Sequence, residues 1–209
     1  MIKKGTFVEL NYTGKTKEGV FDTTDKAVAA AEGLTQEYPY NPIITWIGEG
    51  FVLPALEESL IGKELQKPYT IDIPLAFGKK DAKKIQFVSQ SKFKKQDITP
   101  YPGLQIDVDG QMALIRRVGG GRVLVDFNHP LAGHDVTYEV TALREVTDIA
   151  EKAKAVVLRS FGNIPLDYSE GVLTLTANFP KELEEPVTKQ FSSIIPEITK
   201  VVFKEAKNL

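Results

Sequence analysis

Apolar and polar residues alternate with a period of two in residues 6–14 and 134–146, the pattern of strands with one buried face. The first stretch reads TFVELNYTG and is predicted to end in a turn at Gly14. Further strands are predicted over 42–50 and 68–74. The last strand has no hairpin partner directly before it, so we expect it to join the other three in one sheet.

Two segments between these strands carry residues that typically start and end short helices. In 24–32, a Thr or Asp can cap the start and Gly33 can end the helix. In 52–62, Pro54 suits the first turn and Gly62 suits the stop. Both segments are therefore predicted to be short helices.

Residues 85–128 read as a separate small β unit built from consecutive hairpins. Its predicted strands are 104–108, 112–118 and 122–127, joined by an Asp109-Gly110 turn and by the glycines at 119–121. The economical arrangement is an outer domain, 1–84 with 129–147, that is interrupted by this insert. An uninterrupted topology is the alternative.

Residues 148–209 predict the order α-β-β-α-β, a compact third domain. Asp148 and Glu151 have the spacing of a capping box at the start of the first helix. The second helix is predicted to begin at or just before Pro186.

Composition narrows the function. Of 209 residues 42% are hydrophobic, and no apolar run approaches the roughly 20 residues of a membrane span. No signal peptide is recognisable at the N-terminus, so we expect a cytoplasmic protein without membrane partners. The chain has no Cys, which excludes disulfides and thiolate chemistry, and its net charge of −2 argues against specific nucleic-acid binding.

Seven lysines fall between positions 79 and 95 against one acid, Asp81. We interpret this run as a solvated face. Loose attraction to an acidic partner such as ribosomal RNA is the alternative.

The only two histidines, His129 and His134, share the stretch VDFNHPLAGHD. They could form a metal or acid/base site, a structural corner, or a junction between two folded parts. Only Asp126 and Asp135 are close acids, and no phosphate-binding glycine motif is present. We therefore expect structural histidines, no metal and no cofactor.

Aromatic and aliphatic residues gather at strand ends and loop edges, where a pocket needs them more than a core does, although each could be a core residue. They are Tyr12, Phe21, Trp46, Phe51, Val52, Leu53, Phe77 and Tyr138, with Asp22 as the one carboxylate among them.

Five motifs, in order and spacing, resemble the FKBP-type peptidyl-prolyl isomerases. They are YTG (12–14), GVFDTT (19–24), IGEGFVLPALEESLIG (47–62), AFG (76–78) and VDFNHPLAG (125–133). The chain is similar to the SlyD-like branch over about 150 residues, and its C-terminal part resembles the long archaeal form.

The resemblance implies an α+β fold, in which an antiparallel sheet wraps a short helix and a β-rich insert-in-flap domain interrupts it. It implies a proline pocket with catalytic residues Tyr12, Phe21, Asp22, Leu53, Phe77 and Tyr138, and with substrate-binding residues Ile43, Val52, Leu56, Leu131 and His129. Two positions depart from the best-known single-domain members. Leu56 replaces a tryptophan, and Phe77 replaces a tyrosine that bonds ligand, which argues against tight binding of macrolide inhibitors.

The implied activity is cis-trans isomerisation of X-Pro bonds in unfolded or nascent polypeptides. The insert is implied to bind such chains as a chaperone through Phe87, Leu104, Ile106, Met112 and Leu114, unless these residues form its own core. The rival interpretation is a non-catalytic holdase. Homodimerisation through the C-terminal domain stays open, and nickel handling is disfavoured because the tail VVFKEAKNL has no histidine.

Overall fold

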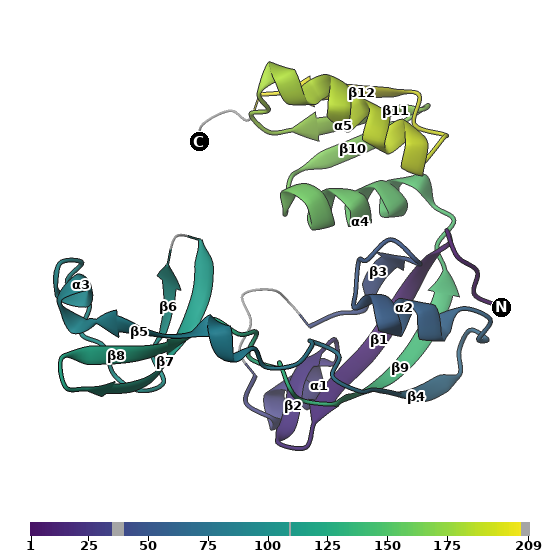
Figure 1. Ribbon diagram of the computed structural model, residues 1–209. Helices are drawn as coiled ribbons and strands as arrows, with labels where there is room; N and C mark the ends of the chain where they lie inside the picture. Colours follow the sequence, from purple (N-terminus) through teal and green to yellow (C-terminus); the bar gives the residue numbers. More distant parts are fainter. Residues whose placement is uncertain (35–39, 109, 206–209) are drawn as a thin grey trace. The chain divides into compact units, whose positions relative to one another are not determined.

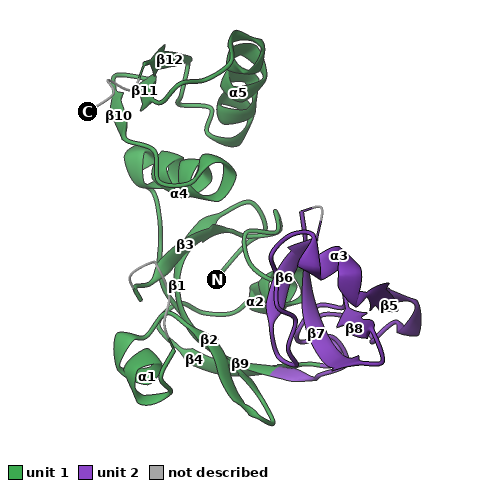
Figure 2. Cartoon of the chain, turned by 90° about the vertical axis from the view of Figure 1, so that its left-hand side faces the viewer, with its two compact units in different colours: residues 1–73, 137–209 green, residues 74–136 purple. Residues whose placement is uncertain are grey.

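The computed structural model describes residues 1–34, 40–108 and 110–205. Contacts divide the chain into two compact units (Figure 2). The first unit comprises residues 1–73 and 137–209, and the second, which we call the insert unit, comprises residues 74–136. The three-domain division made from the sequence stays a prediction.

The first unit contains the predicted sheet (Figure 1). Its strands are β1 (Phe7–Thr16), β2 (Gly19–Thr23), β3 (Ile43–Trp46), β4 (Pro68–Ile73) and β9 (Val136–Glu145). The order is β2-β1-β9-β4, and β3 also pairs with β1. β1 runs antiparallel to β2, β3 and β9. All four predicted strands are confirmed, but β1 continues past Gly14 to Thr16 rather than turning there.

Two short helices accompany this sheet, as predicted. The helix α1 (Lys26–Ala31) is capped by the Asp25 side chain, which accepts hydrogen bonds from two backbone N–H groups of its first turn. The helix α2 (Pro54–Leu60) begins with the predicted proline, and its residues Leu56 and Leu60 are buried.

The C-terminal part has the predicted α-β-β-α-β order. Its elements are α4 (Ile149–Phe161), β10 (Leu166–Ser169), β11 (Val172–Thr176), α5 (Lys181–Ile194) and β12 (Lys200–Lys204). β10 and β11 form a hairpin, and β12 lies parallel to β11. The predicted start of α5 was wrong, because the helix begins at Lys181 and contains Pro186. Pro186 lacks one helical N–H donor, and burial of Val187 and Phe191 offsets that loss.

One apolar core joins this C-terminal part to the first sheet. Phe7 of β1 and Val146 belong to the same cluster as Val156 and Val157 of α4 and Phe191 of α5. Trp46 stacks on Phe7 at a centroid distance of 5.6 Å, and Phe51 meets both rings edge-on. Trp46 and Phe51 are therefore partly buried residues that pack against the core of the first unit, as the core alternative for these two positions expects.

The insert unit holds a four-stranded antiparallel sheet in the order β5-β8-β7-β6. Its elements are β5 (Ile85–Ser89), α3 (Gln90–Lys94), β6 (Gln105–Val108), β7 (Gln111–Gly119) and β8 (Arg122–Asp126). The three predicted strands are confirmed, whereas β5 and α3 were not predicted. Asp109 of the predicted turn lies outside the described residues. Phe93, Ile106, Ala113, Ile115, Val123 and Val125 form the core of this unit.

Candidate active site

The carboxylate of Asp22, on the edge strand β2 of the first sheet, is held by a tyrosine of the neighbouring strand β1. The Tyr12 hydroxyl donates to Asp22 Oδ2 at 2.8 Å. The strand register places Gly14 of β1 opposite Asp22 on one side and opposite Tyr138 of β9 on the other. Three adjacent strands thus bring together four residues predicted from motifs far apart in the sequence: Tyr12, Phe21, Asp22 and Tyr138.

Three rings form what we call the aromatic cluster: Tyr12, Phe21 and Tyr138. Tyr138 meets Tyr12 at a centroid distance of 5.8 Å and Phe21 at 5.9 Å, both in edge-on geometry. Tyr138 is buried, whereas Tyr12 and Phe21 are half-buried. The cluster is a largely apolar surface with one carboxylate beside it.

Gly14 makes this close ring contact possible. A Cβ atom at Gly14 would lie 2.6 Å from Phe21 Cζ and 2.9 Å from Tyr138 Cε1, closer than real Cβ contacts allow. From the sequence, Gly14 was expected to form a turn, and its role in this ring contact was missed. A glycine inside a strand marks a close approach, which is the signal that could have found it.

Burial keeps both phenols of the cluster protonated. It raises the pKa of Tyr138 to about 12, and the charge of Asp22 adds to the shift. The pKa of Tyr12 is raised further, first by burial and then by the charge of Asp22 and the hydrogen bond to it. Both hydroxyls are therefore hydrogen-bond donors at neutral pH.

The loop between β3 and α2 is held by hydrogen bonds to the buried carboxylate of Glu57. Its Oε2 accepts from the backbone N–H groups of Gly48 at 2.8 Å and Gly50 at 3.0 Å, and its Oε1 accepts from Val52 N at 3.0 Å. The Thr45 hydroxyl donates to the same carboxylate at 3.3 Å. Glu57 was not predicted from the sequence, although an acid next to Leu56 on a short helix was the available signal.

This loop delivers the predicted residues Val52, Leu53 and Leu56. Val52 and Leu53 are half-buried, and Leu56 at the first turn of α2 is buried. The Leu53 carbonyl accepts the first bonds of the helix, from Leu56 N and Glu57 N. In the described part of the chain, no group accepts a hydrogen bond from the Leu53 N–H. Ile43 begins β3 opposite Leu10 and is half-buried.

Three predicted site residues belong to the insert unit instead. Phe77 and His129 stack at a centroid distance of 4.3 Å with nearly parallel rings. The backbone N–H of Leu131 donates to His129 Nδ1 at 3.1 Å. Phe77 and His129, on either side of residues 85–128, thus contact each other within the insert unit. That they line the same pocket as Tyr12 stays a prediction.

The histidine stretch is a structural junction. Gly133 N donates to the Gly78 carbonyl, and Leu75 N donates to Asp135 Oδ1 at 2.9 Å, so the stretch is tied to the chain entering the insert unit. Asp126 accepts from Arg116 and Asn128, which lower its pKa despite its burial. Within the described ranges, no three His, Asp or Glu side chains gather as a metal site.

The predicted chaperone residues divide into two groups. Phe87 and Met112 are 69% and 59% exposed, and Leu114 is half-buried. Ile106 is buried in the core of the insert unit, and Leu104 packs against that core. Ile106 and, in part, Leu104 therefore follow the core alternative that the sequence left open, because the small sheet needs apolar side chains beneath it.

No helix in the described part of the chain is both long and apolar enough to cross a membrane.

Comparisons with known proteins identify the family of the chain. Residues 86–131 match the family described as FKBP26, IF domain. A short-type peptidyl-prolyl cis-trans isomerase of Methanocaldococcus jannaschii is 32% identical over 143 residues, which are 67% of this chain and 91% of that protein. The FKBP-type isomerase SlyD of Treponema pallidum is 30% identical over 109 residues, covering 48% of this chain and 61% of that protein. The FKBP-type 16 kDa isomerase of Escherichia coli is 26% identical over 121 residues, covering 54% and 81%. The chain therefore belongs to the FKBP-type peptidyl-prolyl cis-trans isomerases, in their SlyD-like branch.

Proposed function

We propose that this isomerase accelerates rotation about X-Pro bonds in unfolded proteins, and that its insert unit holds those proteins during the reaction. The observation that carries the proposal is the aromatic cluster with the Tyr12–Asp22 hydrogen bond at its edge. The names of the related proteins, all peptidyl-prolyl cis-trans isomerases, support the same reaction.

The reaction needs little from the protein except a shaped apolar surface. Rotation about the amide has a barrier of about 18–20 kcal/mol because the planar bond must lose its resonance. The twisted amide is less polar than the planar one, so transfer from water to an apolar surface favours the twisted form. The rings of Tyr12, Phe21 and Tyr138 offer that surface to the proline ring, and no nucleophile is required.

Two polar groups complete the proposed site. The Leu53 N–H, which has no acceptor among the described residues, donates to a substrate carbonyl and fixes the register of the peptide. Asp22, oriented by Tyr12, lies at the edge of the cluster and polarises the rotating amide. Glu57 positions the Leu53 N–H by holding the loop that precedes it.

The isomerase assignment is tested with Phe21→Ala and Asp22→Ala on a short X-Pro peptide. We expect kcat/KM to fall by about tenfold or more for each, which corresponds to about 1.4 kcal/mol of lost transition-state binding. Lys17→Ala, in the exposed turn of the same hairpin, is the matched control. If both site variants keep the original rate and the original Tm, the assignment is wrong.

The holding role is supported by the exposed apolar residues of the insert unit. Nine large apolar side chains are exposed among the described residues, and five lie in this unit, which is less than a third of the chain. They are Ile85, Phe87, Tyr101, Val108 and Met112. Such a concentration of exposed apolar side chains is typical of a surface that binds other polypeptides.

The holding role is tested by Phe87→Ser combined with Met112→Ser. We expect acceleration of a proline-limited protein refolding reaction to fall by about tenfold relative to activity on a short peptide. Leu183→Ser, at an exposed apolar residue of α5 outside the insert unit, is the control and should not change that ratio. A ratio that stays constant in the double variant would exclude these two residues from client binding.

A further inference from the structure

The outer face of the insert sheet combines one exposed aromatic ring with two arginines. Phe87 of β5 lies opposite Leu124 of β8, and Leu124 lies opposite Arg117 of β7. Val123 and Val125, the neighbours of Leu124, are buried in the core, so alternation places Leu124 on the other face. Phe87 and Arg117 therefore flank one apolar position on the solvent side of the sheet.

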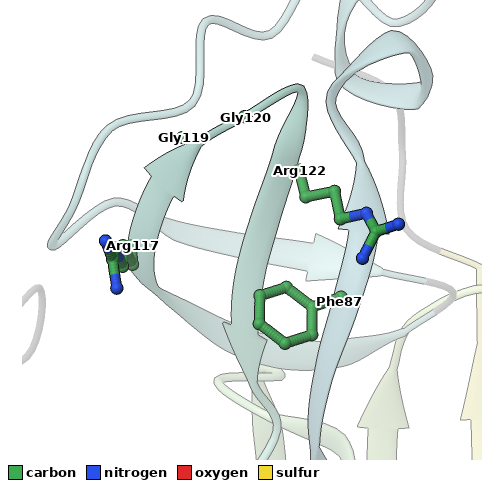
Figure 3. A pocket seen from close by; sticks show the side chains of 5 residues that line it. All are labelled: Phe87, Arg117, Gly119, Gly120 and Arg122. Atoms are coloured by element: carbon green, nitrogen blue, oxygen red, sulfur yellow. The ribbon is translucent and has the colours of Figure 1, made fainter.

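A hollow of about 440 Å³ lies at this place, lined by Phe87, Arg117, Gly119, Gly120 and Arg122 (Figure 3). Its volume falls in the range of about 300–1,000 Å³ that ligand sites occupy. The two glycines bring no side chain into it. Its chemistry is therefore set by one ring and two guanidinium groups.

The two arginines of the hollow have their charges available. The neighbouring Arg116 is paired with Asp126, its Nη2 lying 2.9 Å from Oδ2. In contrast, neither Arg117 nor Arg122 makes an ion pair within the part of the chain that the structure describes. A guanidinium group binds a carboxylate through two parallel hydrogen bonds, so each arginine offers a site for one anion.

The charge of the whole insert unit acts in the same direction. Residues 74–136 contain ten Lys and Arg, six Asp and no Glu, a net charge of +4, although the complete chain carries −2. A cationic unit attracts anionic segments and repels cationic ones, and this selects between clients of equal hydrophobicity.

We infer that the hollow selects polypeptide segments in which an apolar side chain is flanked by Asp or Glu. The apolar side chain packs on Phe87, and the flanking carboxylates bind Arg117 and Arg122. This inference rests on the proposed holding role and adds the class of segment that is held. A polypeptide fits the hollow better than a single-stranded nucleic acid does, because Phe87 is the one ring among its lining residues and nucleobases are bound by successive stacked rings.

The test measures binding of three labelled, proline-free peptides to the full chain by fluorescence anisotropy. The first alternates Phe or Leu with Asp, the second has Asn for every Asp, and the third has Lys. We expect the Asp peptide to bind on the order of tenfold more tightly than the Asn peptide, as two partly solvated ion pairs allow, and the Lys peptide to bind most weakly. Added salt should reduce the advantage of the Asp peptide.

The arginines are tested by Arg117→Gln combined with Arg122→Gln. This variant should bind the Asp and Asn peptides equally. Lys92→Gln combined with Lys94→Gln, on the exposed side of α3, removes the same charge from the same unit and should keep the tenfold preference. Phe87→Ser should weaken both peptides by a similar factor.

The possible outcomes distinguish the selectivity of the hollow from the holding role of the insert unit. If the original protein binds the Asp and Asn peptides equally, the selectivity is refuted and the holding role stands. If it binds neither peptide, both are refuted. If a single-stranded oligouridylate binds more tightly than the Asp peptide and depends on the same arginines, the hollow is a nucleic-acid site and the inference is wrong.

Discussion

Single residues set the spacing of the aromatic cluster, because strand register fixes where a side chain begins but not how closely its neighbours approach. Gly14 leaves the room in which Phe21 and Tyr138 meet. The cluster in turn fixes the protonation of its phenols, since Tyr138 is buried beside the charge of Asp22. Two predictions at this scale follow from an added methyl group at Gly14 and from the phenol proton of Tyr138.

Gly14→Ala adds a methyl group where no space exists and should push Phe21 and Tyr138 apart. We expect a loss of about 1–3 kcal/mol in the free energy of unfolding, measured by urea denaturation, together with reduced kcat/KM. Gly119→Ala is the control for stability, because no atom lies within 4 Å of its added Cβ and its backbone is not left-handed. An unchanged unfolding midpoint for Gly14→Ala would contradict the steric argument.

Tyr138 predicts a loss of stability at alkaline pH. The unfolded phenol ionises near its ordinary pKa of about 10, whereas the native phenol keeps its proton up to about 12. Between these values the native state binds more protons, so the free energy of unfolding falls as pH rises. Tyr138→Phe should show a shallower decline over this window in denaturant titrations, with the exposed Tyr101→Phe as control. Equal slopes for the two variants would show that Tyr138 does not titrate as described.

At the scale of elements, the strands of the first sheet and the order of the C-terminal elements could be predicted from the sequence, because long alternating patterns report burial on one face. β5 and α3 could not, because Ile85 and Phe87 are exposed and α3 is barely more than one turn long. The motifs gave the positions of Tyr12, Phe21, Asp22 and Tyr138. Gly14 and Glu57 lie inside the same motifs, but their roles depend on contacts between elements and could not be recognised there.

Glu57 couples α2 to the loop before it, so a change there should act on the whole loop. Glu57→Gln replaces one of the two acceptor oxygens by an NH2 group, which cannot accept from the loop N–H groups, while the remaining oxygen still can. We expect a loss of about 2–3 kcal/mol in the free energy of unfolding and a fall in kcat/KM as Val52 and Leu53 shift. Glu58→Gln, exposed on the next position of α2, is the matched control. Similar stability and activity of both variants would mean that the loop is held by other contacts.

At the scale of the whole molecule, the C-terminal part completes the core of the first unit. Phe7 of the first sheet shares a cluster with residues of α4, β11 and α5. This sharing depends on contacts between residues far apart in the sequence, which local patterns do not report. The isomerase sheet and the C-terminal elements should therefore unfold together.

Phe191→Ala tests this coupling. Removing a fully buried ring of α5 should cost about 3–5 kcal/mol and lower one common Tm, seen equally in circular dichroism and in loss of isomerase activity. Leu183→Ala, exposed on the same helix, should leave the Tm near its original value. Two separate transitions, with activity lost only in the second, would show that the C-terminal part is energetically independent.

The place of the single tryptophan decides what its fluorescence can report. Trp46 stacks on Phe7 in the shared core, and its indole Nε1–H donates to the Gly5 carbonyl at 3.0 Å. The fluorescence of this ring therefore depends on whether the C-terminal elements cover the sheet. The aromatic cluster that we propose binds proline contains only tyrosine and phenylalanine. The intrinsic fluorescence of the protein therefore reports on packing between the C-terminal elements and the first sheet. Substrate binding has to be followed with a fluorescent label on the peptide.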